Sequence, residues 1–486
     1  MSTTLTAPEP PKTSERLRTT EYVGYALGDT ASNFFFQTFN IFLSFYYVKI
    51  WGIPQKSLLW MMPIVMLISA FADTTMGLIA DRTNSRWGKF RPYLLFGAIP
   101  FGICAYLMFI GPDFSTTGKI IYAFLTYTLM QLCYSVINVP YSSILGVISP
   151  ESRTRAVASS VRFMGAFTGT LLITLFVRPL VKFLGGTTAA GEVNYVAGFR
   201  WTMAIFAIVA VIMFWTTFAT TKERVKPPPK QKSNVGEELR ELIRNWPWVM
   251  LLIASVFSMT FVALRSGSTL FYFQYVVGDS GAVPIFRIGS LEFDRATVFL
   301  TAGSIGLVLG TTCLSSIVRK VDKKYCAAAL SAITGLCFGS FFFLPKDNYP
   351  LMVALHVVAQ FCAGPTSALT WALYGDVADW GEWKYGRRST GLVYSASLFA
   401  IKAGQLAGNF LLPLFLVQFH FNREATTQQP SALLGILIAF SLAPGFIGLL
   451  KATALMIYPL NQKRVDEIER ELAARRSAES AETKPL

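Results

Sequence analysis

Long apolar segments alternate with short polar ones along almost the whole chain. Twelve of the apolar segments are at least about 18 residues long, which is the length expected of a helix that crosses a lipid bilayer. They are too long to be strands of a membrane barrel, and a helix satisfies its own backbone hydrogen bonds in lipid. The pattern predicts spans at residues 22–49, 57–80, 92–111, 118–148, 155–184, 199–219, 247–277, 296–318, 324–345, 349–374, 390–418 and 431–458.

The composition places these segments in a membrane and not in a soluble core. Residues of the AVILMFWYC class make up 53% of the 486 residues, charged residues make up 15%, and the mean hydropathy is +0.45. An average soluble domain has about 45–50% apolar residues when glycine is counted among them. In this chain the figure of 53% does not yet include its 36 glycines. We therefore expect an all-α integral membrane protein with the lipid bilayer as its surroundings.

The distribution of charge predicts the orientation of the chain. The formal net charge of +15 raises nucleic acid as a partner, but the basic residues form short clusters between apolar segments and no single basic face, so we exclude it. Most of the 43 Lys and Arg residues lie in the leader, in the loops that follow even-numbered spans and in the tail. By the positive-inside rule, both termini of this multi-pass protein are cytoplasmic.

A basic stretch with three consecutive prolines separates the first six spans from the last six. Short basic loops follow the second and the eighth span, at 81–91 and 319–324, which is typical of a duplicated six-helix unit. We expect two pseudo-symmetric six-helix bundles around a central cavity. The expected organisation is a flexible cytoplasmic leader at 1–21, a first bundle at 22–220, a cytoplasmic linker at 221–246, a second bundle at 247–458 and a cytoplasmic tail helix at 459–486.

Charged and strongly polar side chains occur within six of the predicted spans. In hydrocarbon such a side chain is costly unless it faces a partner or a wet cavity. Acids and bases from separate helices can pair only around a common centre, which indicates a transport pathway; the alternative is a set of structural ion pairs and interhelical hydrogen bonds without a ligand. The residues are Asp29, Asn33 and Asn40, Ser69 and Asp73, Gln131, Ser135, Asn138 and Ser142, Arg162, Arg265, and Lys402.

A buried acid in such a centre can couple a cation to a solute. The charge of Asp29 or Asp73 must be neutralised before the cavity closes in a low dielectric, and a proton, a sodium ion or a nearby base can each neutralise it. Symport follows if the empty, charged carrier resists the conformational change.

The sequence contains no pattern that is typical of an enzyme, a metal site or a cofactor site. The six cysteines form no CxxC or Cys/His cluster. His356 and His420 lie in no HExxH pattern, and no GxxxxGK[ST] phosphate loop is present. We therefore expect a protein that is not an enzyme and that needs neither a metal nor a cofactor.

Four separated motifs resemble those of a known family. They are GYALGDTASN at 24–33, DRTNSRWGKFRPY at 81–93, NVPYSSILGVIS at 138–149 and YGDVADWGEWKYGRRSTGLVYSASLFAIKAGQ at 374–405. Together, and in this order, they resemble the glycoside-pentoside-hexuronide:cation symporters, relatives of the melibiose carrier within the major facilitator superfamily. The resemblance extends from about Glu21 to the YPLNQKR segment and implies the major facilitator fold.

The resemblance implies roles for several of the polar residues. Asp29 matches a sugar-binding aspartate of the melibiose carrier. Asp73 matches the second of two aspartates in its cation site, but Ser69 stands in place of the first, and losing a carboxylate favours a proton over sodium. Asn138 and Ser142 replace an aspartate and a tryptophan of the sugar site, so the resemblance does not extend to melibiose as the substrate.

Further matches concern the cavity and its cytoplasmic gate. Arg162 matches an arginine near the sugar, and Lys402 matches a lysine near both the sugar and the cation. The family uses charged pairs at the cytoplasmic end of span 10 as an inner gate, and the loop after span 2 accompanies it; these positions are also compatible with ordinary surface charges and positive-inside anchors. The gate residues implied are Arg86, Arg91, Asp376, Asp379 and Arg387.

The role of Arg265, in the seventh predicted span, stays open. Its guanidinium could clamp the carboxylate of a uronide bidentately, neutralise Asp29 or Asp73, or reach backbone carbonyls.

We expect a secondary active symporter of the bacterial inner membrane that takes up a sugar or glycoside (pentoside, hexoside or uronide) with a monovalent cation, a proton being favoured, and that works as a monomer. The candidates for stacking on the sugar ring are Tyr25, Phe36, Tyr134, Tyr141 and Trp371, although helix periodicity alone would assign most of them to packing. The alternatives are a sodium-coupled sugar symporter and an exporter of drugs or organic ions of the same superfamily.

Overall fold

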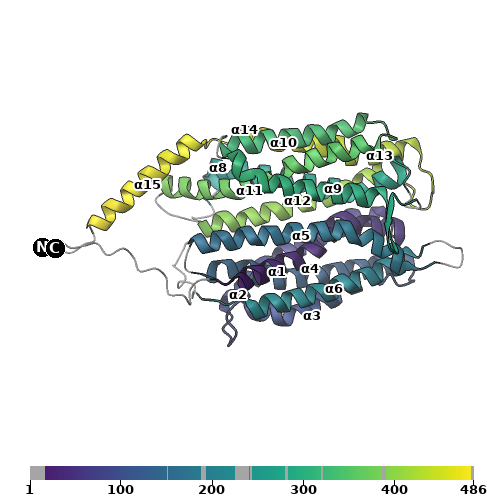
Figure 1. Cartoon of the computed structure of the whole chain (residues 1–486), viewed down its shortest axis with the longest axis horizontal. Coiled ribbons are helices and arrows are strands. Elements are labelled where there is room, and N and C mark those ends of the chain that lie inside the picture. The colour runs from purple at the N-terminus through teal and green to yellow at the C-terminus, as the bar shows by residue number, and fades with distance from the viewer. Residues whose placement is uncertain are drawn as a thin grey trace.

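The computed structural model describes residues 17–149, 152–187, 193–224, 240, 243–279, 283–318, 321–385 and 390–482. Its long helices run roughly parallel to one axis and lie in two groups, with the helices of the first group below those of the second in Figure 1. We call these groups the N-terminal half and the C-terminal half.

The N-terminal half contains a first helix, α1 (Thr19–Thr38), that continues through two π-helical turns, η1 (Phe39–Leu43) and η2 (Tyr46–Ile50). The helices that follow are α2 (Gln55–Arg82), α3 (Arg91–Leu107), α4 (Thr116–Val147), α5 (Ser152–Gly185) and α6 (Tyr195–Thr220).

The C-terminal half begins with α8 (Trp246–Phe271) and the π-helical turn η3 (Tyr272–Val276). Its other helices are α9 (Arg295–Val318), α10 (Lys323–Ser340) with the short η4 (Phe341–Phe343), α11 (Tyr349–Tyr385), α12 (Thr390–Gln418), α13 (Pro430–Phe440) and α14 (Leu442–Ile457). A two-stranded antiparallel hairpin, β1 (Phe286–Ile288) and β2 (Leu291–Phe293), precedes α9 and is an addition to the expected all-helical pattern.

Each predicted span falls on a helix or on an unbroken run of helices. Within the described residues, ten of these are long and apolar enough to cross a membrane by length and composition. The other two predicted spans fall on the run from α1 to η2 and on α3, which is 17 residues long. Large apolar side chains point outward from the bundle and are at least 60% exposed at Phe71, Phe96, Ile208, Leu336 and Phe399, as lipid-facing positions should be.

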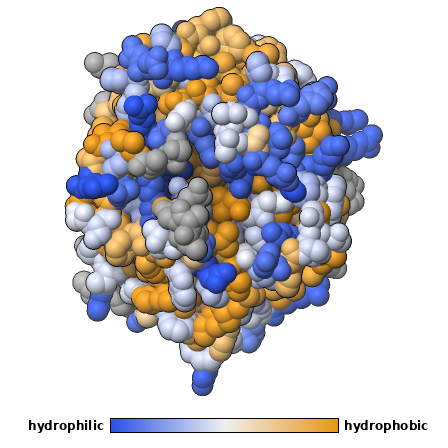
Figure 2. All heavy atoms as spheres, turned by 90° about the vertical axis from the view of Figure 1, so that its right-hand side faces the viewer, coloured by the Kyte–Doolittle hydropathy of each residue, from blue (hydrophilic) through white to orange (hydrophobic). Residues whose placement is uncertain are grey.

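Figure 2 shows the end of the molecule that lies opposite the chain termini, where hydrophilic residues gather among hydrophobic ones. Loops and helix ends lie there in Figure 1. Polar groups at this end and apolar groups along the helices are the distribution that a bilayer imposes.

The two halves repeat one packing scheme. In the N-terminal half α1 packs on α5, α2 on α4 and α3 on α6; in the C-terminal half α8 packs on α12, α9 on α11 and α10 on α14. Between the halves, α2 packs on α12 and α5 packs on α9. When each helix is matched with its counterpart in the other half, α2 corresponds to α9 and α5 corresponds to α12, so the contact of α2 with α12 becomes that of α9 with α5. The halves are therefore related by an approximate two-fold axis.

Small residues make the repeated helix contacts close. A Cβ atom at Gly165 of α5 would lie 2.3 Å from the carbonyl oxygen of Ala26 on α1, and one at Gly404 of α12 would lie 2.5 Å from that of Val256 on α8. Glycine therefore lets the backbones approach at the same place in both halves. In the N-terminal half this contact holds α5 against the polar face of α1.

The tail folds as the expected helix, α15 (Gln462–Glu482), and it packs against the C-terminal half. Its residues Val465, Ile468 and Leu472 are buried in the same apolar cluster as Trp248. The indole Nε1 of Trp383, near the end of α11, donates to Glu471 of α15 at 2.6 Å.

We expect Gly165→Val to destabilise the protein by about 1–3 kcal/mol, because the added side chain forces α1 and α5 apart. Thermal unfolding of the purified protein in detergent measures this effect. Gly146→Val is the matched control, since nothing lies within 4 Å of a Cβ atom at Gly146. Equal losses of stability in the two variants would contradict the assigned role of Gly165.

Candidate functional site

A cavity of about 320 Å³ lies between α2 and α4 of the N-terminal half and α12 of the C-terminal half. We call it the α2–α12 cavity. It combines hydrogen-bonding groups with aromatic and aliphatic walls, as sites for small polar solutes do. Its lining residues are Phe36, Phe39, Asn40, Met66, Asp73, Gln131, Tyr134, Asn138, Val139, Ser142, Ser143, Ile401, Lys402, Gln405 and Asn409.

Lys402 joins the two halves across this cavity. Its ammonium Nζ lies 2.6 Å from the Oδ2 atom of Asp73 and 2.6 Å from the Oγ atom of Ser69, both on α2. The side chain of Asp73 is 31% exposed and that of Lys402 is 19% exposed, so the pair remains accessible. Three of the four residues expected at the cation site, Asp73, Ser69 and Lys402, therefore form one cluster, and Lys402 neutralises the carboxylate of Asp73. The fourth, Asp29, lies outside this cluster and pairs with Arg162.

Asp29 and Arg162 form a second ion pair within the N-terminal half. The Nε atom of Arg162 on α5 lies 2.9 Å from Oδ2 of Asp29 on α1, and its Nη2 donates to Oγ of Ser142 at 3.4 Å. Since Ser142 lines the α2–α12 cavity, the pair lies behind one wall of that cavity. The amide of Asn33 donates to the backbone carbonyl of Asp29 at 2.9 Å.

The polar stripe expected on span 4 supplies three of the six α4 residues that line the cavity. Gln131, Asn138 and Ser142 line the cavity, whereas Ser135 is buried and donates to the carbonyl of Gln131 at 3.1 Å. Gln405, which we did not select from the sequence, also lines the cavity. Because Gln405 follows Lys402 by three residues, it lies on the same face of α12. This spacing could have identified Gln405 as a cavity residue from the sequence.

Of the five aromatic candidates for sugar stacking, Phe36 and Tyr134 line the α2–α12 cavity, whereas Tyr25, Tyr141 and Trp371 do not. Tyr141 is fully buried, its hydroxyl donates to the carbonyl of Tyr25 at 2.6 Å, and its ring packs on that of Tyr25. Trp371 packs beside Tyr374 against the apolar cluster of the C-terminal half. Neither residue lines the α2–α12 cavity, where Phe36, Phe39 and Tyr134 are the aromatic residues present.

Arg265 lies away from both carboxylates. It is 4% exposed on α8, and its Nη2 atom is 3.0 Å from Nδ1 of His356 on α11. Asp29 and Asp73 already have Arg162 and Lys402 as partners. Of the alternatives left open by the sequence, the structure therefore gives no support to neutralisation of Asp29 or Asp73 by Arg265.

Three of the expected gate residues, Asp376, Arg91 and Arg86, make contacts within their own halves. Asp376 on α11 accepts from the ammonium of Lys323 at 2.8 Å, and Asp379 lies one turn later on the same helix. Arg91 donates to the carbonyl of Phe218 at 2.7 Å, and Arg86 lies over the ring of Trp87. Arg387 lies outside the described residues.

Sequence reasoning missed Glu223, which organises the loop before α3. Its carboxylate accepts hydrogen bonds from three successive backbone N–H groups, those of Lys89, Phe90 and Arg91, at 2.7–3.0 Å. A carboxylate at the start of a helix is favoured by the helix dipole. Nothing in the local sequence distinguishes Glu223 from an ordinary acid in a basic linker.

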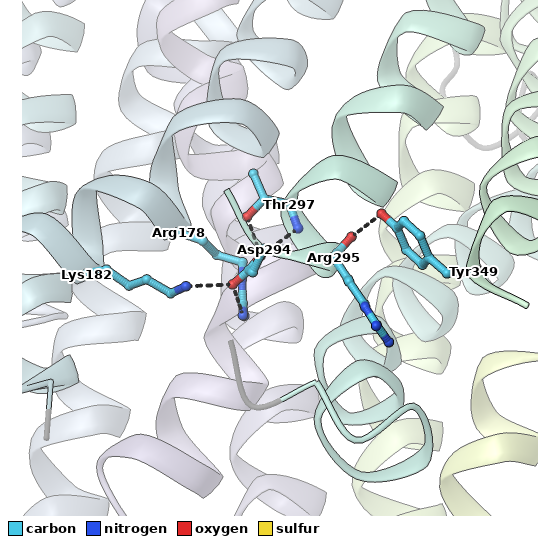
Figure 3. A network of polar contacts seen from close by, with 6 residues as sticks. All are labelled: Arg178, Lys182, Asp294, Arg295, Thr297 and Tyr349. Atoms are coloured by element: carbon cyan, nitrogen blue, oxygen red, sulfur yellow. Dashed lines mark hydrogen bonds and ion pairs between the residues drawn. The ribbon is translucent and has the colours of Figure 1, made fainter. Parts of the chain in front are cut away.

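A second polar connection between the halves, also missed, joins α5 to the start of α9 (Figure 3). Arg178 of α5 lies 2.5 Å from Oδ2 of the fully buried Asp294, and Lys182, one turn further on, lies 3.4 Å from the same atom. Thr297 donates to Asp294 through both its backbone N–H and its hydroxyl. Asp294 thus caps α9 and binds two cations of the other half.

Burial alone would raise the pKa of the Asp294 carboxyl, but the charge and hydrogen bonds of Arg178, the charge of Lys182 and the hydrogen bonds of Thr297 hold this pKa well below its usual range.

Additional contacts join the halves near this end: Gln55 donates to the carbonyl of Phe421 at 2.7 Å, and Arg423 donates to that of Gly52.

Comparisons with known proteins show which family model and which relatives this chain is similar to. Residues 24–462 match the model of a family described as MFS/sugar transport protein. The chain is 34% identical over 465 residues to the inner membrane symporter YicJ of Escherichia coli (strain K12), with 95% of this chain and 96% of the relative covered. It is 32% identical to the putative glycoside/cation symporter YagG (94% and 95% covered) and 31% identical to the glucuronide carrier protein homolog (94% and 96% covered), both of the same organism.

Solved structures support the fold alone. The nucleoside transporter NupG matches 91% of this chain and 100% of its own length with a TM-score of 0.60 and 11% identity. At this identity the likeness concerns the arrangement of the helices and carries no information on the solute.

We expect Asp294→Asn to destabilise the protein by about 3–5 kcal/mol, because it leaves Arg178 and Lys182 buried beside a neutral group. Thermal unfolding of the purified protein at neutral pH measures the change. Glu292→Gln is the matched control: it removes an acid two residues away whose ion-pair partner Arg287 is 64% exposed, so its effect should be below about 1 kcal/mol.

The pH dependence gives a second readout. Since the pKa of Asp294 is lower in the folded protein than its ordinary value of about 4, its stabilising effect is present above about pH 4 and is lost as the pH falls through the folded-state value. The difference in melting temperature between the wild-type protein and Asp294→Asn should therefore shrink as the pH falls below about 4. A difference that is independent of pH would contradict this account.

Proposed function

The chain belongs to the MFS/sugar transport protein family and, within it, to the glycoside-pentoside-hexuronide:cation symporters, and on this basis we propose that it couples the entry of a cation to the uptake of a sugar or glycoside. Its apolar helices and its relatives support a multi-pass protein of the bacterial inner membrane. The observation that carries the proposal is the cluster of Lys402, Asp73 and Ser69 beside the α2–α12 cavity.

This cluster supports a coupling mechanism. The carboxylate of Asp73 holds the ammonium of Lys402 at 2.6 Å. A proton or another cation on Asp73 cancels the charge that retains Lys402, and the ammonium is then available to a solute hydroxyl in the cavity. Loading of the cation thereby prepares the solute site, and a carrier without its cation keeps α2 and α12 connected.

The amides and hydroxyls of the α2–α12 cavity support a polyhydroxylated solute. Asn40, Asn138 and Gln405 each offer both a donor and an acceptor, so they match sugar hydroxyls, which also do both. The Asp29–Arg162 pair behind Ser142 adds a carboxylate and a guanidinium that can approach the solute after small side-chain movements.

Proton coupling is favoured over sodium coupling by the ligands present. Sodium prefers several oxygen ligands, charged ones among them, whereas the cluster offers a single carboxylate with the hydroxyl of Ser69 beside it. A proton needs only the carboxylate.

The orientation proposed has both termini in the cytoplasm, which the basic loops support. The network around Asp294 and the contacts of Gln55 and Arg423 then join the halves at the outer end. With this orientation, the contacts support a chain that is closed toward the outside. One chain suffices as the transport unit, since its two halves together form the cavity walls.

Uptake in proteoliposomes under imposed gradients tests the proposal. We expect Asp73→Asn to abolish accumulation of solute against its gradient, a loss of at least about tenfold, while counterflow exchange persists, because the variant cannot carry the coupling charge. Asp113→Asn, which changes an exposed loop acid, is the control.

A panel of radiolabelled neutral glycosides, pentosides and uronides, driven in turn by proton and sodium gradients, identifies the cation and the solute. Accumulation by Asp73→Asn equal to that of the wild-type protein would refute the assigned coupling site. Gradient-driven extrusion of lipophilic cations in place of sugar uptake would favour an exporter.

A further inference from the structure

A second cavity, of about 140 Å³, lies between the halves on the side of α8 and α9. We call it the Arg265 cavity. The N-terminal half contributes Gln37, Thr170 and Thr174, and the C-terminal half contributes Arg265, His356 and Lys451, among other residues. Whole-ligand pockets usually measure about 300–1,000 Å³, so this cavity has the size of a subsite for one chemical group.

Arg265 is held in this cavity by neutral groups. Its guanidinium lies 4.2 Å from the centre of the Phe338 ring, and Nη2 contacts His356. Since arginine only donates, the contacted nitrogen of His356 accepts and the imidazole is neutral. The Nε atom of Arg265 is buried and has no hydrogen-bond partner among the described residues. One donor of a buried cation is therefore unused.

Lys451 supplies a second buried cation from α14. It is 8% exposed, and its ammonium donates to the hydroxyls of Ser258 and Thr366, each at 3.2 Å. Both partners are neutral, and an ammonium has a third donor to offer. The hydroxyl of Ser331, which also lines the cavity, is buried and bonds to nothing in the part of the chain that the structure describes.

The acids of the described chain leave the charge of this cavity uncompensated. None of the described residues that line it is an aspartate or a glutamate. Asp29, Asp73 and Asp294 are paired with Arg162, Lys402 and Arg178, respectively. Two cations that share a cavity inside a membrane protein repel each other and are costly to bury without an anion.

We propose that the Arg265 cavity is a subsite for the anionic group, a carboxylate or a sulfonate, of the transported solute, with Arg265 and Lys451 as its ligands. The proposal rests on the proposed transport function and narrows its substrate class to acidic sugars or glycosides. The free donor of Arg265 and that of Lys451 then bind oxygen atoms of the acid in charge-assisted hydrogen bonds. The hydroxyl of Ser331 supplies a neutral donor.

Binding to the purified full-length protein, measured by calorimetry, tests this subsite with matched probes. The 4-nitrophenyl glycosides of glucuronic and galacturonic acid are compared with those of glucose and galactose, which carry a hydroxymethyl group in place of the carboxylate. We expect the acid of at least one pair to bind about tenfold or more tightly than its neutral partner, since charged hydrogen bonds of this kind contribute that much.

Arg265→Gln and Lys451→Gln should each reduce this preference for the acid by about tenfold while leaving the binding of the neutral glycoside within about threefold. Arg265→Lys, which keeps the charge, should retain part of the preference and guards against a folding defect. Arg287→Gln, which removes an arginine that is 64% exposed on the hairpin, is the control and should change nothing.

Three outcomes would overturn the subsite: no acid binds more tightly than its neutral partner, the preference survives unchanged in both Gln variants, or inorganic phosphate alone binds as tightly as the acids and abolishes the preference. The last result would assign the cavity to a free anion. Cation-driven uptake of a neutral glycoside without any preference for acids would refute the subsite but not the transport function. Preferential binding of the acids, without cation-driven uptake of either the acidic or the neutral glycosides, would refute the transport function but not the subsite.

Discussion

A charge inside a membrane is costly unless it meets an opposite charge or faces a polar cavity, and this constraint organises the structure. The pair of Asp29 and Arg162 lies within the N-terminal half, and the pair of Lys323 and Asp376 lies within the C-terminal half. Such pairs fix helices inside one rigid unit. The pairs Lys402–Asp73 and Arg178–Asp294 cross from one half to the other, so they are the ones that must break and form again if the halves move.

The sequence predicted the helices because their length is a property of the bilayer, which leaves its mark as uninterrupted apolar runs. It also predicted the polar faces, since the spacing along span 4 places Gln131, Asn138 and Ser142 on one side of a helix. Which helices are neighbours follows from packing between distant segments. The partners of Arg162 and Lys402 could therefore be identified only from the fold or from a family resemblance.

Other features depended on surroundings that no local pattern records. Tyr141 and Trp371 looked like stacking residues, but aromatic side chains in spans serve packing as readily as binding, and both lie in packed regions. In the sequence, Asp294 and Glu223 resemble ordinary loop acids. The cations that bind Asp294 and the backbone groups that bind Glu223 are far away along the chain, so no local pattern shows them. Arg265 was recognised as unusual, while Lys451, the second cation beside its cavity, was not.

The two pairs that connect the halves have opposite polarity. In one, the base comes from the C-terminal half and the acid from the N-terminal half; in the other the assignment is reversed. Separation of either pair therefore leaves facing walls of unlike sign with water between them, and these walls attract each other over a Debye length of about 8 Å in physiological salt. Dissolved electrolyte weakens that attraction, so the rate at which an opened vestibule shuts becomes sensitive to ionic strength on that side of the membrane.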